Sequence, residues 1–251
     1  MTDGSPLARG LRADVFLVER GFAGSRAEAQ AAIAAGQVRI DGVTIAKPAQ
    51  LLGDNVRVDY APAHPYVSRG ALKLVAALDA FAIFPTGHVC LDIGASTGGF
   101  TQVLLERGAA KVYAIDVGHG QLRAKLASDP RVVSLEGLNA RDLRTEQIFE
   151  KPGLITIDVS FISLKVALSP ALALAAAGAI LIALVKPQFE VGRERVGKGG
   201  IVKSESDREA ACEGFQSWIS RDQGWVVQGA MESPIEGGDG NREYLVAARK
   251  P

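Results

Sequence analysis

A glycine-rich segment that opens with a carboxylate is the strongest chemical signal in the sequence. It reads Asp92-Ile-Gly-Ala-Ser-Thr-Gly-Gly-Phe100, after an apolar stretch and before an amphipathic one. Glycines let a backbone approach a ligand closely because they carry no Cβ atom. The spacing is not the GxGxxG of dinucleotide sites, and a carboxylate at the strand end would repel a pyrophosphate. The loop therefore favours S-adenosylmethionine, which carries a sulfonium and an amino group.

Further groups for the same ligand follow neighbouring predicted strands. Asp116 ends the next strand, where an acid can accept hydrogen bonds from both hydroxyls of a ribose. Asn139 and Ala140 follow the third strand, where class I methyltransferases contact the adenine. A glycine turn with solvated acids is the simpler alternative. The residues predicted to bind the cofactor are Asp92, Gly94, Ala95, Ser96, Gly98, Gly99, Phe100, Asp116, Val117, Asn139, Ala140 and Asp158.

Two lysines and two acids are expected to meet in one cleft at the ends of the strands. Lys73 lies on a predicted helix, and Asp158 ends the fourth strand. Lys186 ends the fifth strand, and Glu243 begins the last. A ribose 2′-hydroxyl must lose its proton as it attacks a methyl group, and a neutral lysine can accept it. Lys186 is the predicted base, with Lys73 lowering its pKa and the two acids orienting the lysines.

Other methylation chemistries have signatures that this chain lacks. The segment Asp158-Val-Ser-Phe161 has no prolines, unlike the motif of amino-methylating enzymes. Cys90 begins a core strand and Cys212 falls within a helix, so neither is placed to attack a cytosine ring. These two cysteines form no CxxC pair and have no histidine cluster, so no disulfide framework or metal site is predicted. Their scarcity fits a reducing cytosol.

Alternating strands and helices from residue 68 onward would position these groups. Such alternation predicts an α/β fold with a mostly parallel sheet covered by helices on both faces. Two final strands joined by a loop predict an antiparallel pair at one edge. The predicted helices are 68–81, 100–107, 120–126 and 206–221, with an alanine-rich helix from Pro170. The predicted strands are 89–93, 111–115, 132–135, 154–157, 180–185, 225–230 and 244–248.

A smaller unit precedes this fold. Apolar spacing predicts helices over 11–19 and 26–35, with Ser25 as the N-cap and Glu28 completing a capping box. Alternating residues before Asp41-Gly42 predict a hairpin turn, and 54–58 is a predicted strand. Proline-rich residues 61–65 form a semi-rigid joint.

The segment SRAEAQAAIAAGQVRIDG in this unit closely resembles the S4 RNA-binding module. In that family two helices and the following loop present basic and polar groups to structured RNA. The resemblance implies RNA contacts by Arg9, Arg12, Ser25, Arg26, Gln30, Arg39 and Lys47. A protein-docking domain with ordinary solvated arginines is the alternative.

Lys73, Asp158, Lys186 and Glu243 match the Lys-Asp-Lys-Glu tetrad of FtsJ-type 2′-O-ribose methyltransferases. The segments SRGALKL, LDIGASTGGFT, DVSFISL, LVKPQFEVGR and GNREYL look like the TlyA family, also called haemolysin A. The resemblance covers nearly the whole chain. It implies a class I, Rossmann-like methyltransferase with a seven-stranded sheet over 68–251, a linker over 61–67 and an S4 domain over 1–60. It also implies 2′-O-methylation of cytidine in ribosomal RNA. The end at Pro251, without a further helix, favours 23S over 16S RNA.

Residues 186–203 hold five basic residues, two acids and several glycines. They are predicted to form a mobile loop that covers the substrate. Phe189 could stack on a base or pack beneath the loop. The residues of this domain predicted to contact RNA are Arg69, Arg193, Arg195, Lys198 and Lys203.

Composition excludes some classes of protein. With 28 basic and 28 acidic residues, the chain as a whole is not strongly basic. The apolar stretch 167–185 contains Pro170 and Gly178, so a helix followed by a strand is favoured over a membrane span. We expect a cytoplasmic protein with ribosomal RNA or a ribosomal subunit as partner, and no obligate protein partner. The alternatives are a membrane-active haemolysin, a non-catalytic ribosome-assembly factor and an S4-bearing pseudouridine synthase.

Overall fold

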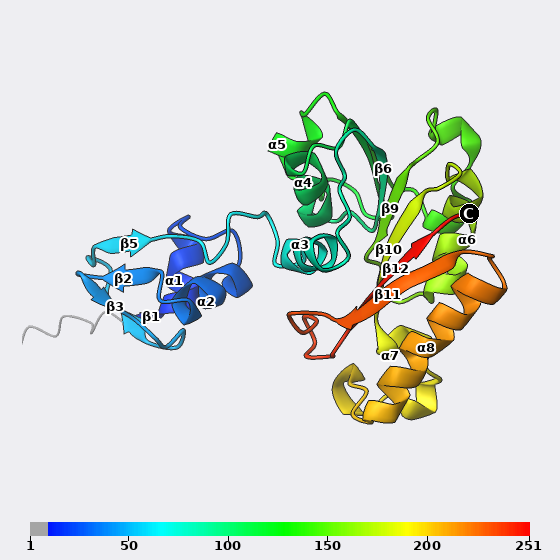
Figure 1. Cartoon of the computed structure of the whole chain (residues 1–251). Coiled ribbons are helices and arrows are strands. Elements are labelled where there is room, and N and C mark those ends of the chain that lie inside the picture. The colour runs from blue at the N-terminus through cyan, green and yellow to red at the C-terminus, as the bar shows by residue number, and fades with distance from the viewer. Residues whose placement is uncertain (1–9) are drawn as a thin grey trace, which may run out of the picture. The chain divides into compact units, whose positions relative to one another are not determined.

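The computed structural model describes residues 10–251, which form two compact units (Figure 1). One unit ends at Pro65 and the other begins at Tyr66. Arg9, predicted to contact RNA, lies outside the described residues.

The small unit packs two helices against short strands. Its core includes Phe16, Leu17, Ile33 and Val38, all nearly inaccessible to solvent. Ser25 Oγ accepts a hydrogen bond from the Glu28 amide at 3.2 Å, which confirms the predicted N-cap of the second helix. The helices are α1 (Ala13–Glu19) and α2 (Arg26–Ala34). The strands are β1 (Leu11–Arg12), β2 (Val38–Ile40), β3 (Val43–Thr44), β4 (Leu51–Leu52) and β5 (Val58–Tyr60).

Strand pairing in the small unit agrees with the predicted hairpin turn but not with the predicted strand over 54–58. Ile40 pairs with Val43 across Asp41-Gly42, which confirms the hairpin turn. The prediction of a strand over 54–58 is wrong by several residues. Residues 51–52 pair with β1, and β5, which pairs with β2, starts only at Val58.

The large unit is built on the expected seven-stranded sheet, in the order β11-β12-β10-β9-β6-β7-β8. Six of its strands run in the same direction, and β12, which lies between β10 and β11, is antiparallel to both. The carboxyl ends of β6, β7, β8 and β9 therefore meet at one edge, where ligands bind in this class of sheet. The strands are β6 (Val89–Ile93), β7 (Lys111–Asp116), β8 (Val132–Glu136), β9 (Leu154–Ile157), β10 (Ile180–Val185), β11 (Val226–Glu232) and β12 (Tyr244–Arg249).

Helices cover both faces of this sheet (Figure 1). Along β6, Leu91 and Ile93 join the core beneath α6 and α8, while Cys90 joins the core beneath α3 and α4. This alternation buries the sheet on both sides, as a parallel sheet requires. The helices are α3 (Ala71–Ala80), α4 (Gly99–Glu106), α5 (Ala124–Ala127), α6 (Leu164–Leu174), α7 (Pro187–Glu190) and α8 (Glu205–Arg221). The short 3-10 turns are η1 (Ala140–Asp142), η2 (Thr145–Gln147), η3 (Arg193–Arg195) and η4 (Lys198–Gly200).

Two helix predictions are wrong at their starting points. Helix α6 begins at Leu164, capped by Ser163, so Pro170 lies inside it rather than in its first turn. Residues 120–123 are not helical, and α5 covers only Ala124–Ala127. The Glu136 carboxylate accepts hydrogen bonds from the amides of residues 120–122, which holds that segment as a loop.

The segment 186–203 was predicted to be a mobile loop, but it contains α7, η3 and η4. Asn241, which is 1% exposed, ties the segment down. Its side chain accepts from the Val202 amide at 2.9 Å and donates to the Gly200 carbonyl at 2.8 Å. The buried Asn241 side chain therefore fixes this glycine-containing segment through hydrogen bonds, where regular secondary structure does not.

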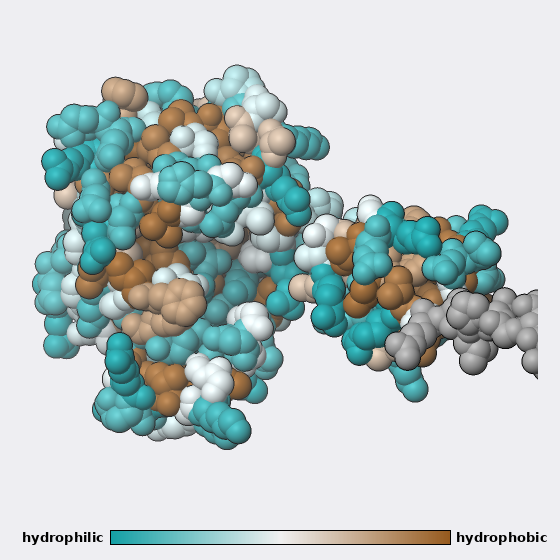
Figure 2. Space-filling view, turned by 180° about the vertical axis from the view of Figure 1, so that it is seen from behind, coloured by the Kyte–Doolittle hydropathy of each residue, from teal (hydrophilic) through white to brown (hydrophobic). Residues whose placement is uncertain are grey.

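The apolar stretch 167–185 is divided between α6, the turn at Gly178 and the buried strand β10. Within residues 10–251, no helix is long and apolar enough to cross a membrane. On the face drawn in Figure 2, hydrophobic residues lie in small groups among hydrophilic ones.

Candidate active site

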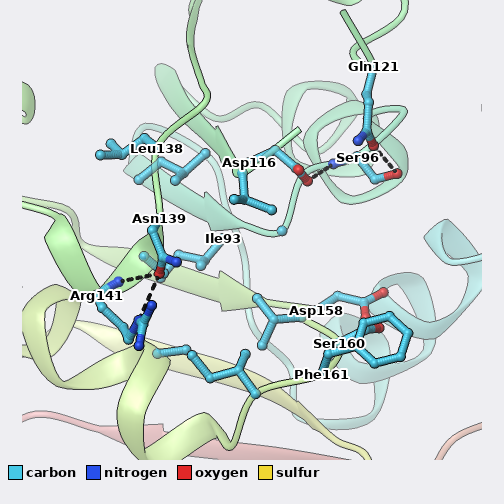
Figure 3. A pocket seen from close by; sticks show the side chains of 17 residues that line it. Ile93, Ser96, Asp116, Gln121, Leu138, Asn139, Arg141, Asp158, Ser160 and Phe161 are labelled. Carbon is cyan, nitrogen blue, oxygen red and sulfur yellow. Dashed lines mark hydrogen bonds between the residues drawn. The ribbon is translucent and has the colours of Figure 1, made fainter. Parts of the chain in front are cut away.

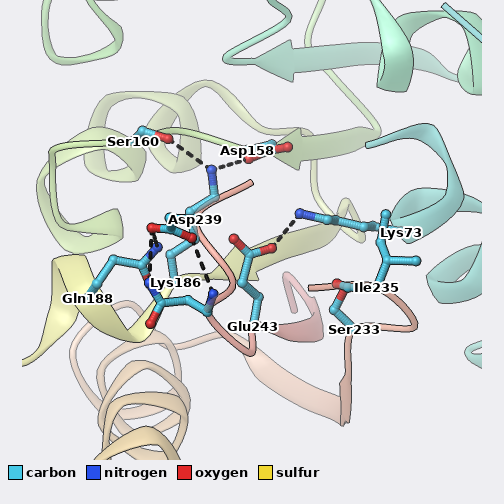
Figure 4. A network of polar contacts seen from close by, with 10 residues as sticks. Lys73, Asp158, Ser160, Lys186, Gln188, Ser233, Ile235, Asp239 and Glu243 are labelled. Atoms are coloured by element: carbon cyan, nitrogen blue, oxygen red, sulfur yellow. Dashed lines mark hydrogen bonds and ion pairs between the residues drawn. The ribbon is translucent and has the colours of Figure 1, made fainter. Parts of the chain in front are cut away.

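Four charged side chains from four elements form two ion pairs (Figure 4). Lys73 on α3 and Glu243, just before β12, are both buried and in direct contact. Lys186, at the end of β10, donates to Asp158 after β9 at 2.6 Å and to Ser160 at 3.0 Å. The structure thus brings together all four predicted catalytic residues, although they are up to 170 positions apart in the sequence.

The two pairs lie close enough to influence each other. Burial raises the pKa of Glu243, and the Lys73 ammonium opposes that rise. The charges of Lys186 and Asp158 also act on the pKa of Glu243, in opposite directions. Each lysine contacts a carboxylate, which fits the predicted role of the two acids in orienting the lysines.

A cavity of about 570 Å³ opens beside these pairs, at the carboxyl ends of β6, β7, β8 and β9 (Figure 3). Asp116 lies on its wall, where one carboxylate oxygen accepts from the Ser96 amide and the other from the Gly118 amide, each at 2.8 Å. The Asn139 side-chain oxygen accepts from the Arg141 amide at 3.1 Å. The predicted cofactor residues that line this cavity are Gly94, Ser96, Asp116, Val117, Asn139, Ala140 and Asp158.

The remaining residues of the glycine-rich loop lie elsewhere. Ala95, Gly99 and Phe100 line a second cavity of about 430 Å³ together with Lys73. Asp158 lines both cavities. Gly98 lines neither of these cavities, and a Cβ there would meet Leu126 of α5 at 2.3 Å.

Asp92 does not reach either cavity, contrary to its predicted role beside a cationic ligand. Its carboxylate is fully buried beneath the loop and accepts hydrogen bonds from Thr101 at 2.7 Å and Thr156 at 3.0 Å. Burial raises its pKa from 3.8 to about 6, although the two threonines oppose the rise. Asp92 therefore joins α4 to β9 and supports the loop from below.

The raised pKa of Asp92 is expected to appear as a pH-dependent difference in stability between the wild type and Asp92→Asn. Because the folded state binds the proton more tightly than the unfolded state, the carboxylate stabilises the fold less as pH rises from about 4 to above 6. We expect the stability of the wild type relative to Asp92→Asn to fall by about 2 kcal/mol between pH 4.5 and 7.5. Urea unfolding at pH 4.5 and 7.5 measures it. A constant difference would contradict the raised pKa.

Three residues at the site, Phe161, Gln188 and Asp239, were not predicted, because their sequence context gave no signal. Phe161 is 91% exposed at a φ of +66°, and its ring centroid lies 5.2 Å from that of Phe189. Gln188 donates to Asp239 at 3.2 Å. These four residues line a third cavity of about 460 Å³, next to Lys186 and Glu243. A bulky residue at positive φ cannot be recognised from spacing, since only the folded backbone defines it.

Glu190 on α7 is a further site residue that sequence patterns missed. It accepts a hydrogen bond from Ser163 Oγ at 2.8 Å and from the Leu164 amide at 2.7 Å, and burial raises its pKa. It therefore joins α7 to the start of α6, and so to the segment that carries Phe161.

The residues predicted to contact RNA fall into several groups. Arg12, Arg26 and Gln30 all contact Asp14 in the small unit. Ser25 is an N-cap, while Arg39 and Lys47 are exposed. In the large unit, Arg69 lines the cavity around Lys73. The others, Arg193, Arg195, Lys198 and Lys203, are exposed along and beyond η3 and η4, where Arg195 pairs with Asp207 at 3.3 Å.

Among residues 10–251, no group of three or more His, Cys, Asp or Glu side chains is placed to hold a metal ion.

The sheet order, with a cavity at its carboxyl edge, is that of the class I methyltransferase fold. The chain belongs to the FtsJ-like methyltransferase family, whose model matches residues 66–250. An S4 domain model matches residues 11–58.

Related proteins cover most of the chain. It is 47% identical over 247 residues to the 16S/23S rRNA (cytidine-2′-O)-methyltransferase TlyA of Mycobacterium tuberculosis, covering 97% of this chain and 91% of that one. It is 41% identical to the 23S rRNA (cytidine-2′-O)-methyltransferase TlyA of Campylobacter jejuni over 203 residues, 78% of this chain and 75% of that one. A solved protein of Streptococcus thermophilus with a provisional hemolysin name has a TM-score of 0.76 at 40% identity, covering 97% and 89%.

Proposed function

We propose that the protein transfers a methyl group from S-adenosylmethionine to the ribose 2′-hydroxyl of a cytidine in ribosomal RNA. The observation that carries this proposal is the placement of Asp158 and its partner Lys186. Asp158 lines the cavity that fits the cofactor, and Lys186 lines the adjoining cavity with Glu243. Both relatives described above have 23S RNA and cytidine 2′-O in their names, which favours large-subunit RNA as the acceptor.

The lining residues fit the proposed cofactor. Asp116 has lone pairs left for ribose hydroxyls after accepting two amide hydrogen bonds. Val117, which is 67% exposed, and Leu138 supply apolar contacts for a purine ring. Asp158 and the loop around Gly94 supply acceptors for an amino group. When bound, S-adenosylmethionine supplies an electrophilic methyl group on a positively charged sulfur.

The protein's own residues would then orient the acceptor and remove its proton. Lys186 is held by Asp158 and Ser160 and lines the third cavity. Once Lys186 has released its own proton to solvent, its neutral Nζ is the group we assign to accept the 2′-hydroxyl proton as the oxygen attacks the methyl carbon. Lys73 lines the second cavity and Glu243 lines the third, so their buried pair lies beside this site. The pair adds no net charge to it.

Phe161 is the group we assign to stack on the acceptor base. Its strained backbone holds an exposed ring between the first and third cavities. Because stacking is worth about 1–3 kcal/mol per base, Phe161→Ala is expected to lower kcat/KM for RNA by roughly tenfold or more, with cofactor affinity unchanged. Phe149→Ala is the control, since Phe149 is 84% exposed and lies before β9, at the opposite edge of the sheet. Equal losses in both variants would remove this role.

The proposed reaction is tested by labelled methyl transfer to purified 30S and 50S particles, followed by nucleoside analysis. We expect label in 2′-O-methylcytidine from the 50S particle. Label on a base would refute the 2′-O chemistry. No label in either particle, with S-adenosylmethionine bound, would favour a non-catalytic assembly factor, the second function compatible with an S4 domain. We place this activity in the cytoplasm, where ribosomal subunits are available.

A further inference from the structure

Asp14, at the start of α1, is a charged residue with no solvent exposure in the small unit. Three side chains donate to its carboxylate. Arg12 does so through Nε and Nη2 at 3.0 and 3.1 Å, Arg26 through Nη2 at 2.9 Å, and Gln30 through Nε2 at 2.7 Å. One buried carboxylate therefore gathers groups from the start of α1 and from along α2.

The partners of Asp14 remain accessible although the carboxylate is buried. The Arg12 and Arg26 side chains are 45% and 57% exposed. A guanidinium has five N–H donors, and Asp14 uses two from Arg12 and one from Arg26. The cluster of two cations and one anion keeps a net positive charge, with donors directed away from the carboxylate. Arg12 lowers the pKa of Asp14 well below its usual range, so the carboxylate stays ionised at neutral pH.

We propose that Asp14 is a positioning residue that holds Arg12, Arg26 and Gln30 as one phosphate-binding face for the RNA substrate. The inference rests on the proposed function, because that function supplies the RNA. A free arginine loses about 2 kcal/mol of side-chain entropy when it becomes fixed. The contacts to Asp14 restrict both guanidinium groups before RNA arrives, so less of that cost falls on binding.

Two other roles for Asp14 predict different results. If Asp14 only cancelled positive charge, its neutralisation would strengthen RNA binding, because each added positive charge near phosphates raises affinity. If Asp14 only stabilised the fold of the small unit, its substitution would weaken RNA binding even in a chain that lacks both arginines. Positioning predicts weaker binding that disappears in such a chain.

The test uses the full chain and a 23S rRNA transcript as the probe. Asp14→Asn is expected to raise Kd roughly tenfold and to reduce the slope of log K against log salt by about 1. Asp59→Asn is the matched control, because Asp59 is an exposed carboxylate that pairs with Arg57 at 3.5 Å in the same unit. We expect Asp59→Asn to leave Kd unchanged or slightly lower. Unchanged or tighter binding by Asp14→Asn overturns the inference.

A double-mutant cycle separates positioning from folding. In the Arg12→Gln, Arg26→Gln background, Asp14→Asn is expected to have no further effect on Kd, and a further loss overturns the inference. Should Asp14→Asn fail to fold, Arg12→Lys with Arg26→Lys replaces it, since this pair keeps the charge but loses the forked geometry. Wild-type affinity in that variant overturns the inference. Failure of the wild type itself to bind rRNA would count against the proposed function instead.

Discussion

Lys186→Ala is expected to lower kcat for RNA methylation by on the order of a thousandfold, the upper part of the range for a lost general base. The Nζ of Lys186 lies between the Asp158 carboxylate and Ser160, next to the cavity that would hold the acceptor ribose. Alanine removes the only nitrogen at this position that could accept the hydroxyl proton, and leaves the cavity around Asp116 intact. Cofactor affinity is therefore expected to stay within about twofold of the wild type.

Single-turnover methylation of 50S particles and calorimetric titration with S-adenosylmethionine measure the two quantities separately. Lys151→Ala is the matched control, because Lys151 is exposed and precedes β9 at the opposite edge of the sheet. It is expected to match the wild type in both assays. If Lys186→Ala instead lost cofactor affinity with kcat unchanged, Lys186 would be a cofactor ligand, and the assignment as base would be wrong.

The sheet could be predicted from the sequence because each strand carries a local signal. Ile180–Val185 is a short, continuous apolar run, and Leu154–Ile157 is apolar except for Thr156, which is typical of strands buried on both faces. The terminal pair was also predictable, since a glycine-rich loop joins β11 and β12. That β12 inserts between β10 and β11 is a property of the whole sheet, and the chain order alone does not determine it.

Elements that depend on distant contacts were predicted less well. Pro170 indicated a helix start, yet Ser163 caps α6 seven residues earlier, and Glu190 binds the same helix terminus from another segment. Glycines in 197–200 indicated mobility, but one buried side chain, Asn241, anchors the segment from 41 residues away. In both cases a tertiary hydrogen bond outweighs the local preference of the chain.

In the candidate site, too, local patterns could be predicted and tertiary contacts could not. The tetrad was predictable because its four residue types match a known pattern. Its pairing was not, since Lys73 contacts Glu243 and Lys186 contacts Asp158 only after α3, β9, β10 and β12 have come together. Asp92 was predicted to face the ligand because it ends a strand. The alternation of side chains along β6 turns it into the core instead, toward Thr101 and Thr156.

Gly94→Ala is expected to disrupt the site through its backbone. Gly94 has a φ of +81°, and a Cβ there would lie 2.2 Å from the Asp158 carbonyl oxygen. Both the loop and the Asp158 backbone would have to move, which would displace the Asp158 carboxylate from Lys186. We expect cofactor affinity to fall at least about tenfold and the free energy of unfolding to fall by about 2–4 kcal/mol, from backbone strain plus overpacking.

Gly178→Ala is the control that separates the steric clash of an added Cβ atom from the backbone strain of a positive φ. Gly178 has a similar φ of +72°, but nothing lies within 4 Å of an added Cβ. It is expected to lose only about 1–2 kcal/mol of stability through the left-handed backbone, with cofactor affinity unchanged. Calorimetric titration and urea unfolding of both variants measure these effects. Equal loss of stability with full cofactor affinity in Gly94→Ala would mean that the loop yields freely, and that close approach to Asp158 does not define the site.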